Sequence, residues 1–403
     1  MKKYIDSIPV GNKESFWKVI PKNWEIKTLN AVCDFLDSQR IPIKDIDRTK
    51  MPGIYPYYGA SGIIDYVNKY IFDDDLILLA EDGANIINRS TPIAFLVNGK
   101  IWVNNHAHVL KVRPNTDRYY LCAYLESLKY EKYNTGTAQP KLNRETCEKI
   151  PVLVPPLPEQ RKIADILNTW DKAIEKQTQL IEKLELRKKG LMQQLLTGKK
   201  RLPGFSGEWK KVKFSSIIEK MSNGYVYDTN NTGDIPITRI ETISKGNIDY
   251  SKVGFIQYVG ELEKYKLRKG DILFSHINSI AHIGKVAMFD GNKDLYHGMN
   301  LLLIRAKEII NKNYLYYFLS STIARRKVRS FAKQAVNQAS VNTDELKKWI
   351  LYIPEIEEQS AIAQILAETD QEIKFYQEKL KLLRQQKRGL MQQLLTGKKR
   401  IKF

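Results

Sequence analysis

The chain has 403 residues, of which 43% are hydrophobic, so it can bury a sizeable core and form two or three domains. Lys and Arg outnumber Asp and Glu by 65 to 45, which gives a formal net charge of +20. This composition excludes a wholly disordered chain. The charge favours a polyanionic partner such as nucleic acid, although a basic surface can also serve solubility alone.

The first residues and the cysteines indicate the compartment. The start MKKYIDSIPV lacks the apolar stretch of a signal peptide, and the longest apolar runs, such as residues 76–80, are too short to span a bilayer. Cys33, Cys122 and Cys147 stand far apart with no CxxC pair, so neither a disulfide framework nor a thiolate zinc site is indicated. We therefore expect a cytoplasmic protein.

A first globular domain is expected over residues 1–154 and a second over residues 202–353. Trp24 and Trp209 stand near the start of each, and both are followed five positions later by an apolar side chain. Strand-like runs cover residues 70–83, 91–99 and 101–112 in the first domain, and 233–240, 270–277, 282–291 and 300–306 in the second. Helical stretches follow at residues 118–130 and 313–331. Strands followed by a helix, twice over, predict two α+β domains, between which little sequence similarity survives.

The chain contains an internal repeat. The segment GLMQQLLTGKKR occupies residues 190–201 and recurs without change at residues 389–400. At the same offset of 199, Gln139 and Asn143 align with Gln338 and Asn342, and Glu159-Gln160 aligns with Glu358-Gln359. The repeated unit is about 67 residues long, and chance does not produce it.

Each repeat carries the signals of one long helix, expected within residues 155–201 and 354–403. Acidic residues follow a proline at the start, and a glycine followed by Lys-Lys-Arg marks the end. Apolar residues at steps of four and three form a coiled-coil seam, broken by a lysine at Lys188 and again at Lys387, where it could set register. We expect antiparallel pairing from the pseudo-twofold repeat, while parallel pairing and two ordinary amphipathic helices remain open. The seam residues are Ile163, Leu167, Trp170, Ile174, Leu184, Leu191, Leu195, Ile362, Leu366, Ile373, Leu383, Leu390 and Leu394.

No catalytic or metal constellation is found. The chain has neither an Asn/Asp-Pro-Pro-aromatic loop for methyl transfer nor a P-loop, and its Glu-x-Lys triplets are common in any lysine-rich sequence. His106 and His108 alternate along an expected strand and would share one face, but they lack a cysteine or acidic partner that would make a metal site. We expect no enzyme activity, metal or cofactor in this chain.

Several loops combine amide, hydroxyl and basic side chains suited to DNA, because amides pair with adenine and Lys or Arg with guanine. The alternative for each is a loop whose amides bond the local backbone, or a tyrosine-rich turn packed on the core. Candidate DNA-contacting residues of the first domain are Tyr57, Tyr58, Gly59, Ser61, Asn105, His106, Gln139, Lys141 and Asn143. Those of the second are Arg239, Ser275, His276, Asn278, Ser279, Asn300, Gln338, Ser340 and Asn342.

This arrangement resembles the specificity subunit of type I restriction-modification systems. PPLPEQRKIADIL with GLMQQLLTGKKRLPGF, and its repeat IPEIEEQSAIAQIL with GLMQQLLTGKKR, are similar to that family's conserved regions, whereas PYYGASGIIDYV and GDILFSHINS are similar to its target-recognition domains. The resemblance implies that each domain reads one half of a bipartite site in double-stranded DNA. It also implies that the helices set the spacing and dock two modification (methyltransferase) subunits and, through them, ATP-dependent restriction subunits. A DNA-binding transcriptional regulator and a pure coiled-coil scaffold are the alternatives.

Overall fold

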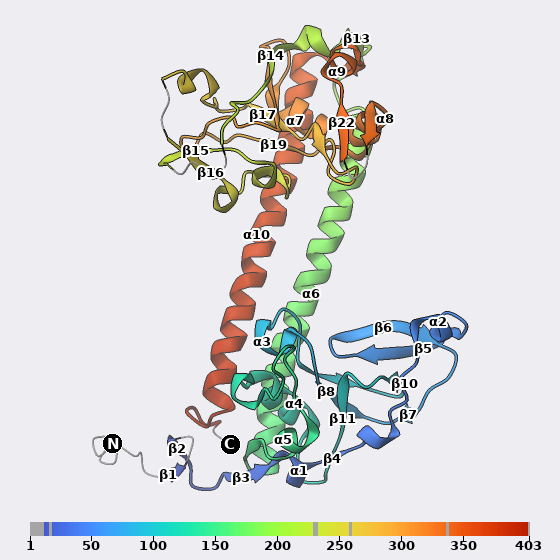
Figure 1. Cartoon of the computed structure of the whole chain (residues 1–403), viewed down its shortest axis with the longest axis vertical. Helices are drawn as coiled ribbons and strands as arrows, with labels where there is room; N and C mark the ends of the chain where they lie inside the picture. Colours follow the sequence, from blue (N-terminus) through green and yellow to red (C-terminus); the bar gives the residue numbers. More distant parts are fainter. Residues whose placement is uncertain (1–11, 16–17, 229–232, 258–259, 336–337, 402–403) are drawn as a thin grey trace. The chain divides into compact units, whose positions relative to one another are not determined.

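A computed structural model describes residues 12–15, 18–228, 233–257, 260–335 and 338–401 (Figure 1). The chain divides into two compact units, one formed by residues 1–178 with 378–403 and the other by residues 179–377. Two 39-residue helices, α6 (Leu157–Leu195) and α10 (Ile356–Leu394), each contribute to both units. No helix in the described part of the chain is both long enough and apolar enough to cross a membrane.

Unit 1 is an α+β domain built around an antiparallel sheet of order β4-β11-β8-β9, beside a second sheet of order β6-β5-β10-β7. Its strands are β1 (Asn12–Ser15), β2 (Lys18–Pro21), β3 (Glu25–Thr28), β4 (Cys33–Phe35), β5 (Pro52–Gly59), β6 (Gly62–Val67), β7 (Phe72–Asp73), β8 (Leu76–Ala80), β9 (Ala94–Val97), β10 (Lys100–Val103), β11 (Ala107–Val112) and β12 (Pro151–Val154). Its helices are α1 (Leu29–Val32), η2 (Asp37–Gln39), α2 (Asp45–Arg48), α3 (Asn85–Asn88), α4 (Arg118–Ser127), η3 (Glu131–Tyr133) and α5 (Arg144–Glu148).

The position of strand β8 in the sheet explains why its sequence is apolar throughout. Successive side chains of a strand point to opposite faces of the sheet. Ile77 and Leu79 pack into the cluster that includes α4, whereas Leu76 and Leu78 pack with Val109 on the opposite side. Both faces of the strand are therefore covered, and every one of its residues is buried.

Unit 2 has the same architecture. Its main antiparallel sheet has the order β14-β20-β17-β19, and strand β13 pairs with β23 as β3 pairs with β12 in unit 1. Its strands are β13 (Lys210–Lys213), β14 (Ile218–Asn223), β15 (Ile235–Ile237), β16 (Gly254–Ile256), β17 (Ile272–Phe274), β18 (Ile277–Asn278), β19 (Val286–Met288), β20 (Leu302–Ala306), β21 (Ala332–Ala335), β22 (Gln338–Val341) and β23 (Ile350–Ile353). Its helices are η4 (Phe214–Ile217), η5 (Ile240–Ile243), η6 (Tyr250–Lys252), η7 (Leu262–Tyr265), α7 (Lys312–Ser320), α8 (Thr322–Ser330) and α9 (Thr343–Lys348).

The predicted α+β fold, present twice, is confirmed, and several local predictions are wrong. The strands expected over residues 70–83 and 270–277 are each two strands, β7 with β8 and β17 with β18, and the members of each pair belong to different sheets. The helix expected over residues 313–331 is two helices, because Ser321 ends α7 and its hydroxyl accepts the Ala324 N–H (3.1 Å) to begin α8. The strand expected over residues 101–112 is broken into β10 and β11 by a turn at Asn105 and His106.

Within each unit, ion pairs show that α6 and α10 run antiparallel. In unit 1, Asp171 of α6 contacts Lys387 of α10, and Glu159, nearer the start of α6, contacts Arg400, just past the end of α10. In unit 2, Lys188 of α6 contacts Asp370 of α10 at 2.5 Å, and Arg201, past the end of α6, contacts Glu358, near the start of α10. The two lysines that break the apolar seam are thus each paired with an aspartate of the other helix.

Several of the predicted seam residues belong to the cores of the two units. Ile163, Leu167 and Leu394 belong to the core of unit 1, and Leu195, Ile362 and Leu366 to that of unit 2. The remaining seam residues are buried (Leu184, Ile373) or half-buried (Trp170, Ile174, Leu191, Leu383, Leu390). Regular coiled-coil interdigitation remains a prediction.

Candidate nucleic-acid interface

Unit 1 carries an open depression of about 470 Å³ where segments far apart in the sequence meet. The tip of the β5–β6 hairpin, with Ser61, forms one wall, and the turn between β10 and β11 forms another. The two are held together because β10 runs parallel to β5, with Val103 opposite Tyr58, and the Asn104 N–H donates to the Tyr58 carbonyl (3.0 Å). Two of the segments that the sequence singled out are therefore neighbours.

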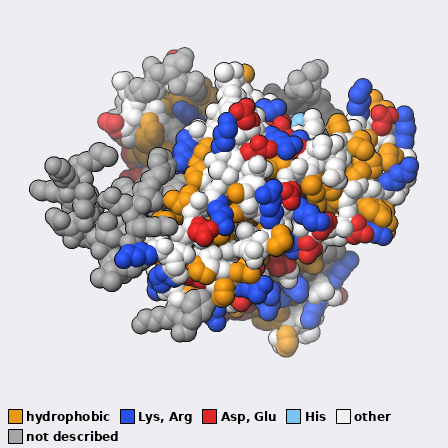
Figure 2. Space-filling model, turned by 90° about the horizontal axis from the view of Figure 1, so that it is seen from below, with side chains coloured by type: hydrophobic (Ala, Val, Ile, Leu, Met, Phe, Trp, Pro, Cys, Tyr) orange, Lys and Arg blue, Asp and Glu red, His pale blue; other side chains and the backbone are white. Residues whose placement is uncertain are grey.

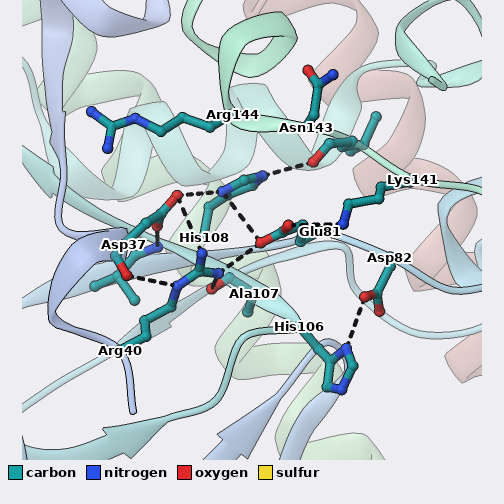
Figure 3. A network of polar contacts seen from close by, with 12 residues as sticks. Asp37, Arg40, Glu81, Asp82, His106, Ala107, His108, Lys141, Asn143 and Arg144 are labelled. Atoms are coloured by element: carbon teal, nitrogen blue, oxygen red, sulfur yellow. Dashed lines mark hydrogen bonds and ion pairs between the residues drawn. The ribbon is translucent and has the colours of Figure 1, made fainter. Parts of the chain in front are cut away.

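The turn before β11 holds His106 at the edge of this depression. Its Nδ1 lies 2.8 Å from a carboxylate oxygen of Asp82 (Figure 3). The backbone N–H of His106 donates to Oδ1 of Asn104 at 2.9 Å. The His106 side chain is 50% exposed, whereas Asn104 is buried. A Cβ at Gly59 would collide with the Ile64 side chain, so the glycine leaves room for Ile64 at the tip of the hairpin. His106 and His108 do not share a face, because His106 precedes the strand and His108 is buried within it.

The predicted loop around residues 135–143 runs beside the same depression. The Leu142 N–H donates to the Glu81 carbonyl (2.7 Å), and the Gly83 N–H donates to the Pro140 carbonyl (3.0 Å). Gln139 and Lys141 are exposed, and Lys141 lies 3.4 Å from a carboxylate oxygen of Glu81. Asn143 has a structural role, since its side chain accepts the Thr146 N–H and caps α5.

A buried polar network fastens this loop to the sheet. His108 is 1% exposed; its Nδ1 contacts Asp37 at 2.7 Å and its Nε2 contacts the Leu142 carbonyl at 2.8 Å (Figure 3). Burial acts to lower the pKa of His108, but its hydrogen bond to Asp37, together with the neighbouring Cys147 side chain, outweighs burial and raises the pKa to about 10. Burial acts to raise the pKa of Asp37, and its hydrogen bond to His108 lowers that pKa overall. The raised pKa of His108 and the lowered pKa of Asp37 together describe a buried ion pair that supports the loop.

The network predicts a pH dependence of stability. Between pH 6.5, its ordinary pKa, and pH 10, near its folded pKa, His108 is protonated more fully in the folded state than in the unfolded state. Its contribution to the free energy of unfolding is therefore complete below pH 6.5 and is lost as the pH rises through about 10. From pH 7 to pH 9 the wild type should lose at least about 1 kcal/mol more unfolding free energy than His108→Gln. Urea unfolding at several pH values measures this, and equal slopes for the two proteins would contradict it.

Unit 2 carries a smaller depression of about 280 Å³ that brings together two predicted residues, Arg239 and Asn300, with Tyr227, Glu241 and Met299. Asn300 has a left-handed backbone (φ +68°), and its exposed side chain has no hydrogen-bond partner among the described residues. The guanidinium of Arg239 forms no ion pair within the same part of the chain, and its Nε is buried there without a partner.

The second predicted loop of unit 2 also lies against the sheet. The Val341 N–H donates to the His276 carbonyl at 2.8 Å, and β22 pairs with β18 so that Ser340 stands opposite Ile277. Ser340 and Ser279 are exposed, and Asn278 donates from Nδ2 to Ser275 Oγ at 3.2 Å. The side chain of Gln338 lies outside the described part of the structure.

Several candidate contacts are corrected to supporting roles. Tyr57, Ser275 and His276 are 1%, 1% and 5% exposed, so in this structure their side chains cannot contact DNA. The Tyr57 hydroxyl instead accepts the Ile43 N–H at 3.1 Å, and burial lowers the pKa of His276. Asn342 accepts the Asp344 N–H and caps α9, as Asn143 caps α5. For both asparagines the structure supports the backbone-bonding alternative.

Other residues of the depressions were not among the predicted contacts. Asn104 belongs to the polar run that drew attention to His106, so the sequence held a signal for it. Asp82 and Glu241 carried no signal, because only the fold places their carboxylates beside the predicted side chains.

Basic side chains do not form a single patch in the view of Figure 2, where Lys and Arg are interspersed with Asp and Glu.

Among the described residues, no three His, Cys, Asp or Glu side chains are grouped as a metal site would require. The three cysteines are buried and unpaired, and burial raises the pKa of Cys33 and Cys122 to about 12.

Comparisons with known proteins agree on one family. A family model described as the type I restriction modification DNA specificity domain matches residues 21–186 and again residues 206–385. A putative type I restriction enzyme specificity subunit of Haemophilus influenzae is 29% identical over 88% of this chain and 90% of its own. One from Methanocaldococcus jannaschii is 41% identical over 194 residues, 47% of this chain and 46% of its own. The crystal structure of the S subunit from M. genitalium has a TM-score of 0.57 at 14% identity, covering 92% of this chain and 96% of that one, which supports the fold alone.

Proposed function

Because the chain belongs to the family of type I restriction-modification specificity subunits, we propose that it recognises a bipartite DNA site, with one half read by each unit. The paired depressions are the observation that most supports this proposal. Each borders the turn that precedes the central strand of its unit, β11 or β20, but their side chains differ, with His106 and Asp82 in one and Asn300 and Arg239 in the other. Equivalent sites with different chemistry suit two different half-sites.

We also propose that the repeated part of the chain docks two modification subunits. An identical segment at residues 190–201 and 389–400 provides two like surfaces, and like surfaces bind like partners. On this proposal, the modification subunits carry out methyl transfer, and restriction subunits that join through them carry out ATP-dependent cutting. This chain provides the DNA sequence specificity and no catalysis. The complex would act in the cytoplasm.

Co-expression with the modification subunit of the same host tests both proposals. We expect a complex of two modification subunits and one copy of this chain by native mass spectrometry. Sequencing of methylated genomic sites should then return a motif of two fixed halves separated by unread bases. The outcome that would refute the proposal is tight site-specific DNA binding by a homodimer of the isolated chain, with no modification subunit retained, as expected of a transcriptional regulator.

A further inference from the structure

The turn that precedes the central strand is equivalent in the two units, although the sequences there show no resemblance. Leu110 of β11 stands opposite Ile77, and Ile304 of β20 stands opposite Ile272 in the matching strands. Counting back four residues from Leu110 and from Ile304 reaches His106 and Asn300.

The neighbouring elements agree with this register. The helices that follow, α4 and α7, have N-caps 11 residues after each turn residue, at Asp117 and Asn311. The strand pairing of Trp102 with Tyr57 in unit 1 corresponds to the pairing of Tyr296 with Ile237 in unit 2, and both pairings are parallel. His106 and Asn300 therefore occupy the same position of one duplicated fold, and each borders the depression of its own unit.

Resting on the proposed function, we infer that these two turns read the bases, with His106 and Asn300 as equivalent specificity-determining residues of the two half-sites. Arg239 is a second such residue in unit 2.

The chemistry of the depressions favours base edges over phosphate. A phosphate accepts hydrogen bonds only and is repelled by carboxylates, whereas base edges in the major groove present both donors and acceptors. Each depression combines both kinds of group: Asp82 beside His106 in unit 1, and Glu241 near Arg239 and Asn300 in unit 2. A site built for the DNA backbone would omit the carboxylates.

The reading groups are also available for a ligand. Asp82 engages Nδ1 of His106 and leaves Nε2 without a partner among the described residues. In unit 2 the amide of Asn300 has no hydrogen-bond partner within that part of the chain, and Arg239, which forms no ion pair there, lines the same depression. An amide can pair bidentately with adenine and a guanidinium with guanine, which predicts an A·T pair and a G·C pair among the bases read by unit 2.

Both turns are held in place by buried contacts. In unit 1 the buried Asn104 accepts the His106 N–H. In unit 2 the Gly298 N–H donates to Thr238 Oγ1 at 2.9 Å, and a Cβ on Gly298 would lie 2.2 Å from the Thr238 carbonyl oxygen. A rigid backbone presents the side chain in one orientation, which reduces the ordering cost of binding.

The test uses the complete complex with modification subunits and sequencing of methylated sites. His106→Ala should relax one base position in one half-site, with about 10-fold to 100-fold lost discrimination, and leave the other half-site unchanged. Asn300→Ala and Arg239→Lys should each relax a position in the opposite half-site only. The exposed Asn68→Ala is the matched control and should change neither.

Exchange variants guard against loss of folding. His106→Asn and Asn300→His keep a hydrogen-bonding side chain and should replace the preferred base rather than abolish methylation. An unchanged motif in all these variants would overturn the inference while leaving the proposed function intact. A uniform loss of affinity with a weaker salt dependence would overturn it in favour of phosphate contacts. If the wild-type complex methylates no defined site, the proposed function itself fails.

Discussion

Replacing Arg201 with methionine is expected to lower the free energy of unfolding by about 3 kcal/mol, because it leaves a buried carboxylate without its cation. Glu358 is 2% exposed, and both its oxygens accept hydrogen bonds from the Arg201 guanidinium at 2.7 Å. The neighbouring Trp209 does not supply a second donor to Glu358, because its Nε1 has no hydrogen-bond partner among the described residues. Urea unfolding followed by circular dichroism measures the effect.

The repeat supplies a matched comparison for this experiment. In unit 1, Arg400 holds the buried Glu159 at 2.7 and 2.8 Å, but Trp24 Nε1 also donates to Glu159 at 3.1 Å. Arg400→Met should therefore cost less, about 2 kcal/mol, since one donor remains. Lys149→Met, which breaks an exposed helical ion pair, should leave the free energy of unfolding almost unchanged, because solvent screens the pair. A larger cost for Arg400→Met than for Arg201→Met would contradict this reading.

The aspartate–lysine pairs between the long helices give the second large expected effect. Asp171→Lys places two ammonium groups together and removes the acceptor of the Tyr119 hydroxyl. We expect a loss of about 2 kcal/mol, because the pair is only partly exposed and like charges then meet at the helix contact. Adding Lys387→Asp to this variant should recover most of the loss, as the opposite charges meet again.

Unit 2 offers the same cycle with Asp370 and Lys188, where the Tyr317 hydroxyl donates to Asp370 at 2.9 Å. Complete cycles of single and double variants isolate the pairwise energy at each site. If the double variants are as unstable as the sum of the single ones, the lysines do not set the register of the helices.

The feature that sequence reasoning predicted best is the helical repeat. Helix α6 spans Leu157–Leu195 and α10 spans Ile356–Leu394, and the glycines beyond them, Gly198 and Gly397, adopt the left-handed backbone expected of helix ends (φ +69° and +71°). These signals are local, since periodicity and end residues act within a few turns of one chain segment. The seam itself does not fix the direction of pairing, because steps of four and three read alike in both directions, and the antiparallel prediction depends on the pseudo-twofold repeat instead.

The sequence by itself determined the family, the twofold repeat and the α+β order of each domain, because these depend on segments that are continuous along the chain. Only the tertiary structure decided that the divergent domains share one sheet topology, that His106 and Asn300 are equivalent, and that Asp82 and Glu241 stand beside the candidate reading groups. Only it revealed that Ser275 and His276 are buried. Strand pairing and burial depend on contacts between residues far apart in the sequence, and those contacts can persist after sequence similarity has been lost.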